Sequence, residues 1–382
     1  MLLTFLSFFI ILSLLILVHE LGHFLVAKKA GILVEEFGLG LPPRIFGKKI
    51  GETIYSLNLL PIGGFVKLYG EEEEVSDDKA GKNRQFINQK PKVRAAVTIA
   101  GVLMNFLLGV VVFSIIYNLV GIPTKIGAVK VVEVVSDSPA QLAGLKNNDV
   151  ILKAGEREIK DSEAFLEETK NYAGKEMLLE VGRQDDNPCR NQVLGAQPGV
   201  EISCRNGNLV LKVVPRENPP AGEGPLGVVI SDVEQKFYPW YQMIPLGIWQ
   251  GLKEALGWLT LISQSLAGMI YQLIFQGVVP RDVAGPIGIF QITGTAVKFG
   301  FLSVLQFLGV LSINLAVINI LPLPALDGGR FVFIAYEAVT KRKPNARLEA
   351  RIHAAGMVFL LGLILLITIN DLLRIIKLVI GN

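Results

Sequence analysis

The stretch LLTFLSFFIILSLLILVHELGH, residues 2–23, decides the class of fold, because an uncharged apolar run leads directly into His19-Glu20-Leu21-Gly22-His23. Histidines four residues apart lie one turn apart on a helix, so both imidazoles point the same way and can share one zinc ion. Glu20 lies about 100° further around the helix, within reach of the zinc site without being a ligand. The pattern predicts a hydrolytic zinc centre on a membrane-spanning helix.

The composition is that of a membrane protein. Of the 382 residues, 51% are hydrophobic and 19% are charged, and the mean hydropathy is +0.47, whereas about a quarter of an ordinary soluble domain is charged. A net charge of +3 without a basic stripe argues against nucleic-acid binding. Two cysteines are too few for a disulfide scaffold or a cysteine zinc site. If both cysteines lie outside the cytoplasm, the sequence leaves open whether they form a Cys189–Cys204 disulfide bridge or remain two free thiols.

Four segments are long and apolar enough to cross a bilayer. Each is near the ~20 residues that span the hydrocarbon layer, and they cover residues 2–26, 93–119, 301–321 and 354–369. The first has no basic n-region and outruns the apolar core of a signal peptide, so we expect it to remain in the protein. The sequence therefore predicts a polytopic α-helical membrane protein with about four transmembrane helices.

Residues 255–275 are ambiguous. They carry no charge over 21 positions, as a span would, yet they include five Thr, Ser or Gln residues, which favours an interfacial amphipathic helix. Residues 28–94 hold 12 Lys or Arg and residues 330–351 hold six, so the positive-inside rule places both loops in the cytoplasm. Four spans satisfy this rule and a fifth does not. We therefore expect an interfacial or half-inserted helix here.

The chain between the second and third spans has the composition of a soluble domain. Residues 138–151, SPAQLAGLKNNDVI, resemble the signature of a bacterial PDZ domain, which binds an extended peptide at a sheet edge. A plain structural β-domain is the alternative. Asn148 stands where glycine is usual and tolerates the left-handed conformation. We expect this domain over 125–215, outside the cytoplasm, with a long loop or insertion over 183–224. If the domain captures a carboxyl terminus, we expect the peptide groove near residues 142–145; a size filter, which we favour, needs no such groove.

A third zinc ligand is needed in a hydrolase, and a candidate lies far along the chain. The third span ends in NILPLPALDGG, residues 319–329, which places Asp327 at membrane depth after an apolar helix. A carboxylate there is costly unless it is paired or binds a metal. Pro322 and Pro324 break the helix and free backbone carbonyls, and the two glycines after Asp327 allow a close backbone approach to the metal helix.

The two motifs and the inserted PDZ-like segment together resemble the site-2 protease family of intramembrane zinc metalloproteases, closest to the bacterial regulator of sigma-E protease type with one PDZ domain. The resemblance covers nearly the whole chain. It implies that His19, His23 and Asp327 bind Zn²⁺ and that Glu20 is the general base. It also implies substrates such as membrane-anchored anti-sigma factors or signal-peptide remnants.

The same resemblance implies residues that handle the substrate. Residues 54–69 are similar to the membrane-associated β-hairpin of that family, with a cytoplasmic hairpin as the alternative. Two asparagines near the end of the third span match family positions, but they lie five residues apart, so one of them is open to a purely structural role. The candidate substrate-binding residues are Asn314, Asn319, Pro322, Gly63 and Gly64.

The expected organisation has four parts. They are a transmembrane catalytic half with the hairpin over 1–120, the PDZ domain over 125–215, an interfacial helix and loop over 240–300, and a second transmembrane half over 301–382. We expect an intramembrane endopeptidase in the cell (inner) membrane that meets lipid and single-span membrane proteins. The alternative is a catalytically silent PDZ scaffold, against which Glu20 argues, because a scaffold has no use for a general base.

Overall fold

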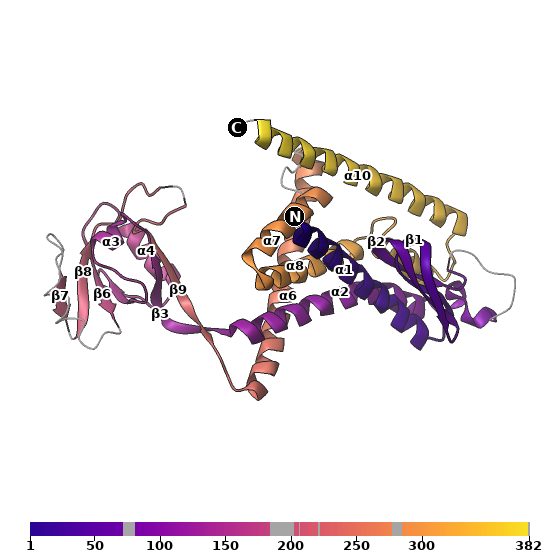
Figure 1. Cartoon of the computed structure of the whole chain (residues 1–382), viewed down its shortest axis with the longest axis horizontal. Helices are drawn as coiled ribbons and strands as arrows, with labels where there is room; N and C mark the ends of the chain where they lie inside the picture. Colours follow the sequence, from indigo (N-terminus) through magenta and orange to yellow (C-terminus); the bar gives the residue numbers. More distant parts are fainter. Residues whose placement is uncertain (72–80, 184–201, 206, 221, 277–284, 381–382) are drawn as a thin grey trace. The chain divides into compact units, whose positions relative to one another are not determined.

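The computed structural model describes residues 1–71, 81–183, 202–205, 207–220, 222–276 and 285–380. The chain divides into two compact units (Figure 1). Unit 1 comprises Met1–Leu119 together with Trp240–Asn382, and unit 2 is Val120–Pro239. Unit 2 is thus an insertion in the sequence of unit 1.

Unit 1 combines long apolar helices with one small β-sheet. In chain order its elements are α1 (Leu2–Lys29), β1 (Val34–Ile50), β2 (Thr53–Leu68), η1 (Lys82–Arg84), η2 (Phe86–Asn88), α2 (Pro91–Val120), α6 (Trp240–Tyr271), the π-helical turn η3 (Gln272–Gln276), α7 (Pro286–Phe299), α8 (Phe301–Ile320), α9 (Asp327–Thr340) and α10 (Ala346–Ile380). The region 240–300 was expected as an interfacial helix and a loop, and its described residues contain two α-helices, α6 and α7.

Four helices of the described residues are long and apolar enough to cross a membrane. They are Leu2–Lys29, Pro91–Val120, Phe301–Ile320 and Arg347–Leu373. The predicted number of spans is confirmed, and the chain is a multi-pass membrane protein. The fourth span is longer than the predicted 354–369, because α10 continues in both directions past the apolar centre. Residues 255–275 lie in α6 and η3, and α6 is not among the four.

Small residues bring α6 close to α2. A Cβ on Gly247 would lie 2.1 Å from Asn118 Nδ2, and a Cβ on Gly251 would lie 2.4 Å from Ser114 Oγ. One turn further, Ala255 is fully buried in a cluster with residues of α2 and α8. Small residues at four-residue spacing let membrane helices approach closely. α6 is therefore packed into the helical part of unit 1.

β1 and β2 each double back, so that together they form four strand segments. Phe37 pairs with both Val66 and Tyr55, and Phe46 pairs with Leu57. The first half of β1 therefore lies between the two halves of β2. The order across the sheet is 44–50, 53–60, 34–39 and 64–68. The segment 64–68 forms one edge of this sheet, next to α1.

In the residues that the structure describes, unit 2 is an antiparallel sheet with two short helices. Its elements are β3 (Ile122–Val134), α3 (Pro139–Leu142), β4 (Val150–Ala154), β5 (Arg157–Glu158), α4 (Ser162–Asn171), β6 (Met177–Gly182), β7 (Ile202–Arg205), β8 (Asn208–Val213) and β9 (Val228–Lys236). The strand order is β7-β8-β6-β4-β3-β9, with β5 paired to β4. Because β9 pairs with β3 from Ile122 to Val134, the unit extends beyond the expected 125–215 at both ends.

Part of the expected long loop is sheet. β7 and β8 lie within 183–224, because Leu209, Leu211 and Val213 alternate toward the interior as strand residues do. Residues 184–201 lie outside the described part of the chain, and Cys189 is among them. Cys204 lies on β7 and is not a free thiol, whereas the bridge to Cys189 involves a residue outside the described part of the chain and stays a prediction.

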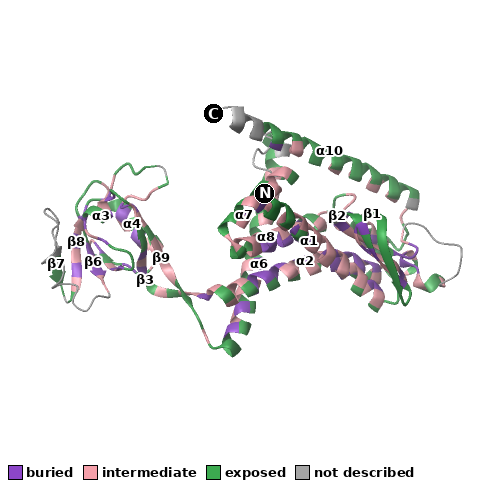
Figure 2. Ribbon diagram, in the orientation of Figure 1, coloured by how far each residue is buried: buried purple, intermediate pink, exposed green. Residues whose placement is uncertain are grey.

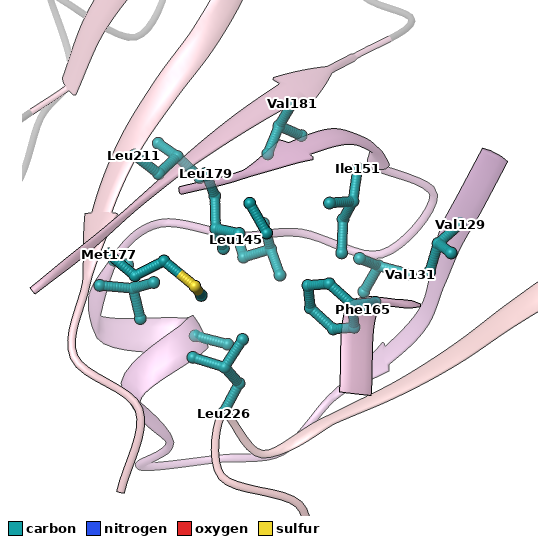
Figure 3. Packing of buried hydrophobic residues seen from close by; sticks show 14 of the residues in the cluster. Val129, Val131, Leu145, Ile151, Phe165, Met177, Leu179, Val181, Leu211 and Leu226 are labelled. Atoms are coloured by element: carbon teal, nitrogen blue, oxygen red, sulfur yellow. The ribbon is translucent and has the colours of Figure 1, made fainter. Parts of the chain in front are cut away.

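One continuous apolar cluster forms the core of unit 2. Figure 3 shows Phe165 of α4 among side chains of the sheet, including Met177 and Leu179 of β6. Leu145 is 4% exposed in this cluster, and Ala143 is 6% exposed. Both are therefore core residues, whereas Leu142 is 69% exposed, and the expected peptide groove near 142–145 stays a prediction.

The predicted PDZ-like segment has the local geometry that its sequence favours. Asn148 has a φ of 70°, the left-handed conformation expected at a position where glycine is usual. The next residue, Asp149, is buried and accepts hydrogen bonds from Arg183 Nε at 2.6 Å and from Lys146 N at 2.8 Å. This buried ion pair fixes the turn before β4.

Candidate active site

A cavity of about 200 Å³ in unit 1 collects the predicted catalytic residues. Residues from α1, the sheet edge 64–68, α2 and the start of α9 form its walls. The lining residues are His19, Glu20, His23, Phe65, Val66, Leu68, Glu71, Phe86, Val97, Thr98, Asp327 and Arg330. The two ends of unit 1 in the sequence therefore meet at this cavity, as the separated motifs predict.

Three donor atoms converge in the cavity. His19 Nε2 lies 3.0 Å from Asp327 Oδ2, His23 Nε2 lies 3.4 Å from the same oxygen, and the two Nε2 atoms are 3.2 Å apart. Among the described residues, these three form the group of His, Cys, Asp or Glu side chains able to hold a metal ion. Within the described residues, Asp327 Oδ2 is buried and has no hydrogen-bond partner, as expected of an atom that faces a cation.

The spacing of the three atoms fits zinc. Bonds of about 2.0–2.1 Å to a tetrahedral ion place neighbouring ligand atoms about 3.3 Å apart. The observed separations of 3.0–3.4 Å bracket this value. Two imidazole nitrogens and one carboxylate oxygen are also a donor set that zinc hydrolases use, with one position left open. The residues present therefore fit the metal that the motif predicts.

Two glycines allow the histidines to reach this position. A Cβ on Gly22 of α1 would lie 2.4 Å from the carbonyl oxygen of Ala100, so α1 and α2 cross with their backbones in contact. A Cβ on Gly101 would lie 2.5 Å from His23 Nε2 and 2.7 Å from His19 Cε1. No other residue type leaves this space for the imidazoles.

The outward nitrogens of both imidazoles are held by α2. His23 Nδ1 lies 2.8 Å from the carbonyl oxygen of Val97, to which it donates, leaving the Nε2 lone pair toward the cavity. His19 Nδ1 lies 3.2 Å from the side-chain amide of Asn105, whose Oδ1 is buried without a partner in the described part of the chain. Turning that amide by 180° lets Oδ1 accept the Nδ1 proton. The spacing of Asn105, four residues after Gly101, would by itself indicate only helix packing.

Asp327 is the first residue of α9, and the loop before it is compact. A Cβ on Gly328 would lie 2.1 Å from the carbonyl oxygen of Leu321, and a Cβ on Gly329 would lie 2.3 Å from that of Leu323. These glycines were expected to approach the metal helix. They instead let α9 pack onto its own preceding loop, which sets where the carboxylate points.

The remaining predicted site residues fall into two groups by their position relative to the cavity. Gly64 lies next to the general-base candidate, since its Cβ would be 3.5 Å from Glu20 Cγ. Gly63, Asn314, Asn319 and Pro322 are not among the lining residues of the cavity. The sequence also gave no sign of the Glu71–Arg330 ion pair, which joins the end of the sheet to α9 at the cavity. Its partners lie 259 positions apart in the sequence, so no local pattern could reveal it.

Known proteins are similar to this chain over nearly its whole length. The family model described as peptidase family M50 matches residues 7–363. A relative from Clostridium perfringens is 36% identical over 94% of this chain and 96% of its own length. Two proteins named zinc metalloprotease RasP are also similar. The one from Shouchella clausii is 30% identical over 97% of this chain and 98% of that protein. The one from Oceanobacillus iheyensis is 27% identical over 97% and 99%.

Proposed function

We propose that this chain, which belongs to peptidase family M50, is an endopeptidase that cuts single-span membrane proteins within or beside their transmembrane segments. As a member of that family it is a membrane metalloprotease with zinc as its cofactor. The convergence of His19, His23 and Asp327 in a cavity that Glu20 also lines carries the proposal. We take the first three as zinc ligands and Glu20 as the general base.

The chain supplies the proton movements of the reaction. When bound, zinc polarises a peptide carbonyl and acidifies water. The Glu20 carboxylate accepts the proton of the attacking water and passes it to the nitrogen of the leaving fragment. Glu20 follows His19 on α1 but is not one of the three convergent donors. It can therefore carry a proton while the ligand set stays complete.

The sheet edge 64–68 is suited to bind an unwound transmembrane substrate. A transmembrane helix hides its amides in internal hydrogen bonds, so it must unwind before it is cut. In lipid, each unpaired backbone group costs several kcal/mol. Within the described part of the chain, residues 64–66 pair with β1 on one side only, and Phe65 and Val66 line the cavity. We propose that an unwound substrate adds to this edge as a further strand.

The charges near the site support a cytoplasmic orientation. α1 ends in Lys28 and Lys29, and Arg330 follows Asp327 by three residues. Basic residues beside spans favour the cytoplasmic side. The side chain of Arg330 is 45% exposed and that of Glu71 is 20% exposed, so a polar, accessible pair lies on the wall of the cavity and gives water a route. We propose a cell (inner) membrane location with unit 2 outside the cytoplasm.

We propose that unit 2 is a PDZ-like domain that selects substrates. Residues 138–151 have the turn geometry of their signature. β9 is the last strand in the sheet order, α4 contacts it, and Gly227 precedes it with a φ of 68°. That edge suits an added peptide strand better than residues 142–145 do. We favour exclusion of substrates with bulky folded ectodomains over capture of a carboxyl terminus.

A purified-protein assay tests the endopeptidase activity. The full chain in detergent is incubated with a single-span substrate, and mass spectrometry maps the products. We expect cleavage within or beside the apolar segment and none with Glu20→Gln. Products cut only in water-soluble loops would contradict the proposal. A comparison of membrane proteomes from cells with the wild-type chain or Glu20→Gln would then identify natural substrates.

Cross-linking tests the strand-addition step. With Cys189 and Cys204 replaced by serine in the Glu20→Gln background, a cysteine at Val66 should form a disulfide with a cysteine in the substrate segment. Ile45 provides a matched control, because it is 62% exposed on the opposite edge of the same sheet. Equal cross-linking at Val66 and Ile45 would show that the substrate does not select the 64–68 edge.

Domain removal tests the role of unit 2. Replacing residues 122–236 with a flexible linker should allow cleavage of substrates with intact ectodomains and preserve cleavage of trimmed ones. If the replacement instead stops cleavage of trimmed substrates, carboxyl-terminal capture is the correct account of unit 2.

A further inference from the structure

α10 is the most exposed of the candidate spans, yet it makes specific polar contacts with the rest of unit 1. Only 6% of the most apolar 18-residue stretch of α10 is buried, against 44% of the corresponding stretch of α2. Figure 2 shows most of α10 as exposed. Its residue His353 is one of three histidines in the chain, and the other two are the ligand candidates on α1. Nothing in the catalytic scheme uses His353, so its position requires a separate explanation.

His353 contacts the loop that carries Asp327. Its Nδ1 accepts a hydrogen bond of 3.0 Å from the backbone N–H of Ala325, two residues before Asp327. Its ring lies 5.6 Å from that of Phe333 on α9. One turn along α10, Gly356 packs on the same loop so closely that a Cβ would lie 2.3 Å from Pro324 Cβ. α10 therefore holds the loop by one hydrogen bond and one close backbone contact.

The loop conformation needs such support. Ala325 has a φ of 73°, in the left-handed region that side chains other than glycine rarely adopt. A residue held there persists only when its surroundings enforce the conformation. The Ala325 N–H bond supplies that enforcement at the residue itself. Since Leu326 is the cap of α9 and Asp327 its first residue, a relaxed Ala325 would turn the start of α9.

The choice of histidine at this position points to the acceptor atom. When Nδ1 accepts, the ring proton is on Nε2, and this atom is buried without a partner in the part of the chain that the structure describes. Burying an unpaired donor is unfavourable, so an apolar side chain would serve better if packing were the only requirement. The Nδ1 acceptor is what an apolar residue cannot supply.

We propose that His353 is a positioning residue for Asp327: by accepting the Ala325 N–H, it holds the 321–326 loop so that the Asp327 carboxylate faces His19 and His23. This inference rests on the proposed ligand role of Asp327. A second polar contact fixes α10 along its axis, since Asp371 accepts the N–H groups of Gly285 at 3.0 Å and Gly288 at 2.9 Å. It lies 18 residues, about 27 Å, from His353.

Zinc retention is the first test. His353→Ala in the full chain should release zinc to a chromophoric chelator about 10-fold faster than wild type, at the low end of the effect of outer partners of metal ligands. The cobalt-substituted protein should show a changed visible spectrum, and hydrogen exchange of peptide 321–327 in the metal-free protein should be faster. Met357→Ala is the matched control, because Met357 is 49% exposed on the same helix. Release and spectrum equal to wild type in folded His353→Ala would overturn the proposal.

Two conservative variants separate positioning from packing. Asparagine places an acceptor near the Nδ1 position and glutamine places one near Nε2, so His353→Asn should restore zinc retention and His353→Gln should not. For cleavage, the Gln variant should lower kcat with KM nearly unchanged, because the substrate edge is untouched. If the Asn and Gln variants behave alike, the proposal fails, and this comparison holds even if His353→Ala does not accumulate.

A third variant separates this inference from the proposed function. Asp327→Ala should lose zinc entirely. If it keeps zinc, the proposed ligand set fails. If it loses zinc while the His353 variants retain it as wild type does, only the positioning role fails.

Discussion

The two units bury their apolar residues in different ways. Among the described residues of unit 2, sixteen buried apolar residues form one cluster. In the part of unit 1 that the structure describes, the buried apolar residues are divided among three smaller clusters. Many large apolar residues of its helices are exposed, and Figure 2 marks long stretches of these helices as exposed. Water drives burial in unit 2, whereas lipid is as apolar as leucine and drives little association between helices.

The difference explains how the site is positioned. Gly22 allows contact between helix backbones, and Gly101 leaves space for the two imidazoles. Val97, Asn105 and His353 supply hydrogen bonds. Close contact and polar pairing carry the geometry where apolar burial cannot. Substitutions in unit 1 should therefore act on zinc through shape and hydrogen bonds, and substitutions in unit 2 should act on folding through apolar area.

Gly101→Val should have the largest effect. Its side chain would occupy the space of both imidazoles, so we expect complete loss of zinc and of cleavage. Gly257→Ala is the control, because a Cβ there meets nothing within 4 Å. Metal analysis of the purified proteins measures the outcome. Stoichiometric zinc in Gly101→Val would mean that the helix crossing is not what positions the histidines.

Phe165→Ala tests the other side of the comparison. Removing this fully buried ring should destabilise unit 2 by about 3–5 kcal/mol, with zinc content unchanged. Hydrogen exchange of the full chain, resolved by peptide, measures both units at once. If exchange in α1 and α2 rises as much as exchange in β6, the two units fold as one and the comparison is broken.

Asn105→Ala should have an intermediate effect. Losing the partner of His19 Nδ1 should weaken zinc binding 10- to 100-fold, measured by competition with a chelator. Helix packing should be kept, since alanine is smaller than asparagine. An unchanged zinc affinity would return Asn105 to the packing role that its spacing predicts.

Glu52→Gln should have the smallest effect. Glu52 accepts two hydrogen bonds from Arg84, at 2.7 and 2.6 Å, which lower the pKa of the exposed carboxyl. The lowered pKa of Glu52 stabilises the folded state at pH values above the unfolded pKa of about 4.3. This stabilisation is lost as the pH falls through the pKa of the folded state. The difference in thermal midpoint between wild type and the variant should therefore be small at pH 7 and vanish at acid pH. A difference that grows on acidification would contradict this sign.

The sequence predicted the spans, and it singled out the three residues whose donor atoms converge in the cavity, because each leaves a local pattern. In H-E-x-x-H the two histidines are one helical turn apart, and an apolar run of ~20 residues has the length of a membrane span. The sheet edge, the Glu71–Arg330 pair and the contact of His353 with Ala325 join distant parts of the chain. Unit 2 was expected to end near 215 because β9 follows a segment rich in Gly and Pro, and only its pairing with β3 shows that it belongs to the sheet.

In this proposal His19, His23 and Asp327 bind zinc, and Glu20 moves protons without binding it. One measurement tests these separate roles directly. Zinc content and cleavage of a transmembrane substrate are measured together for wild type, Glu20→Gln and Asp327→Ala. We predict that Glu20→Gln binds one zinc and does not cleave, and that Asp327→Ala binds none and does not cleave. Cleavage by Glu20→Gln, or full zinc in Asp327→Ala, would contradict the account.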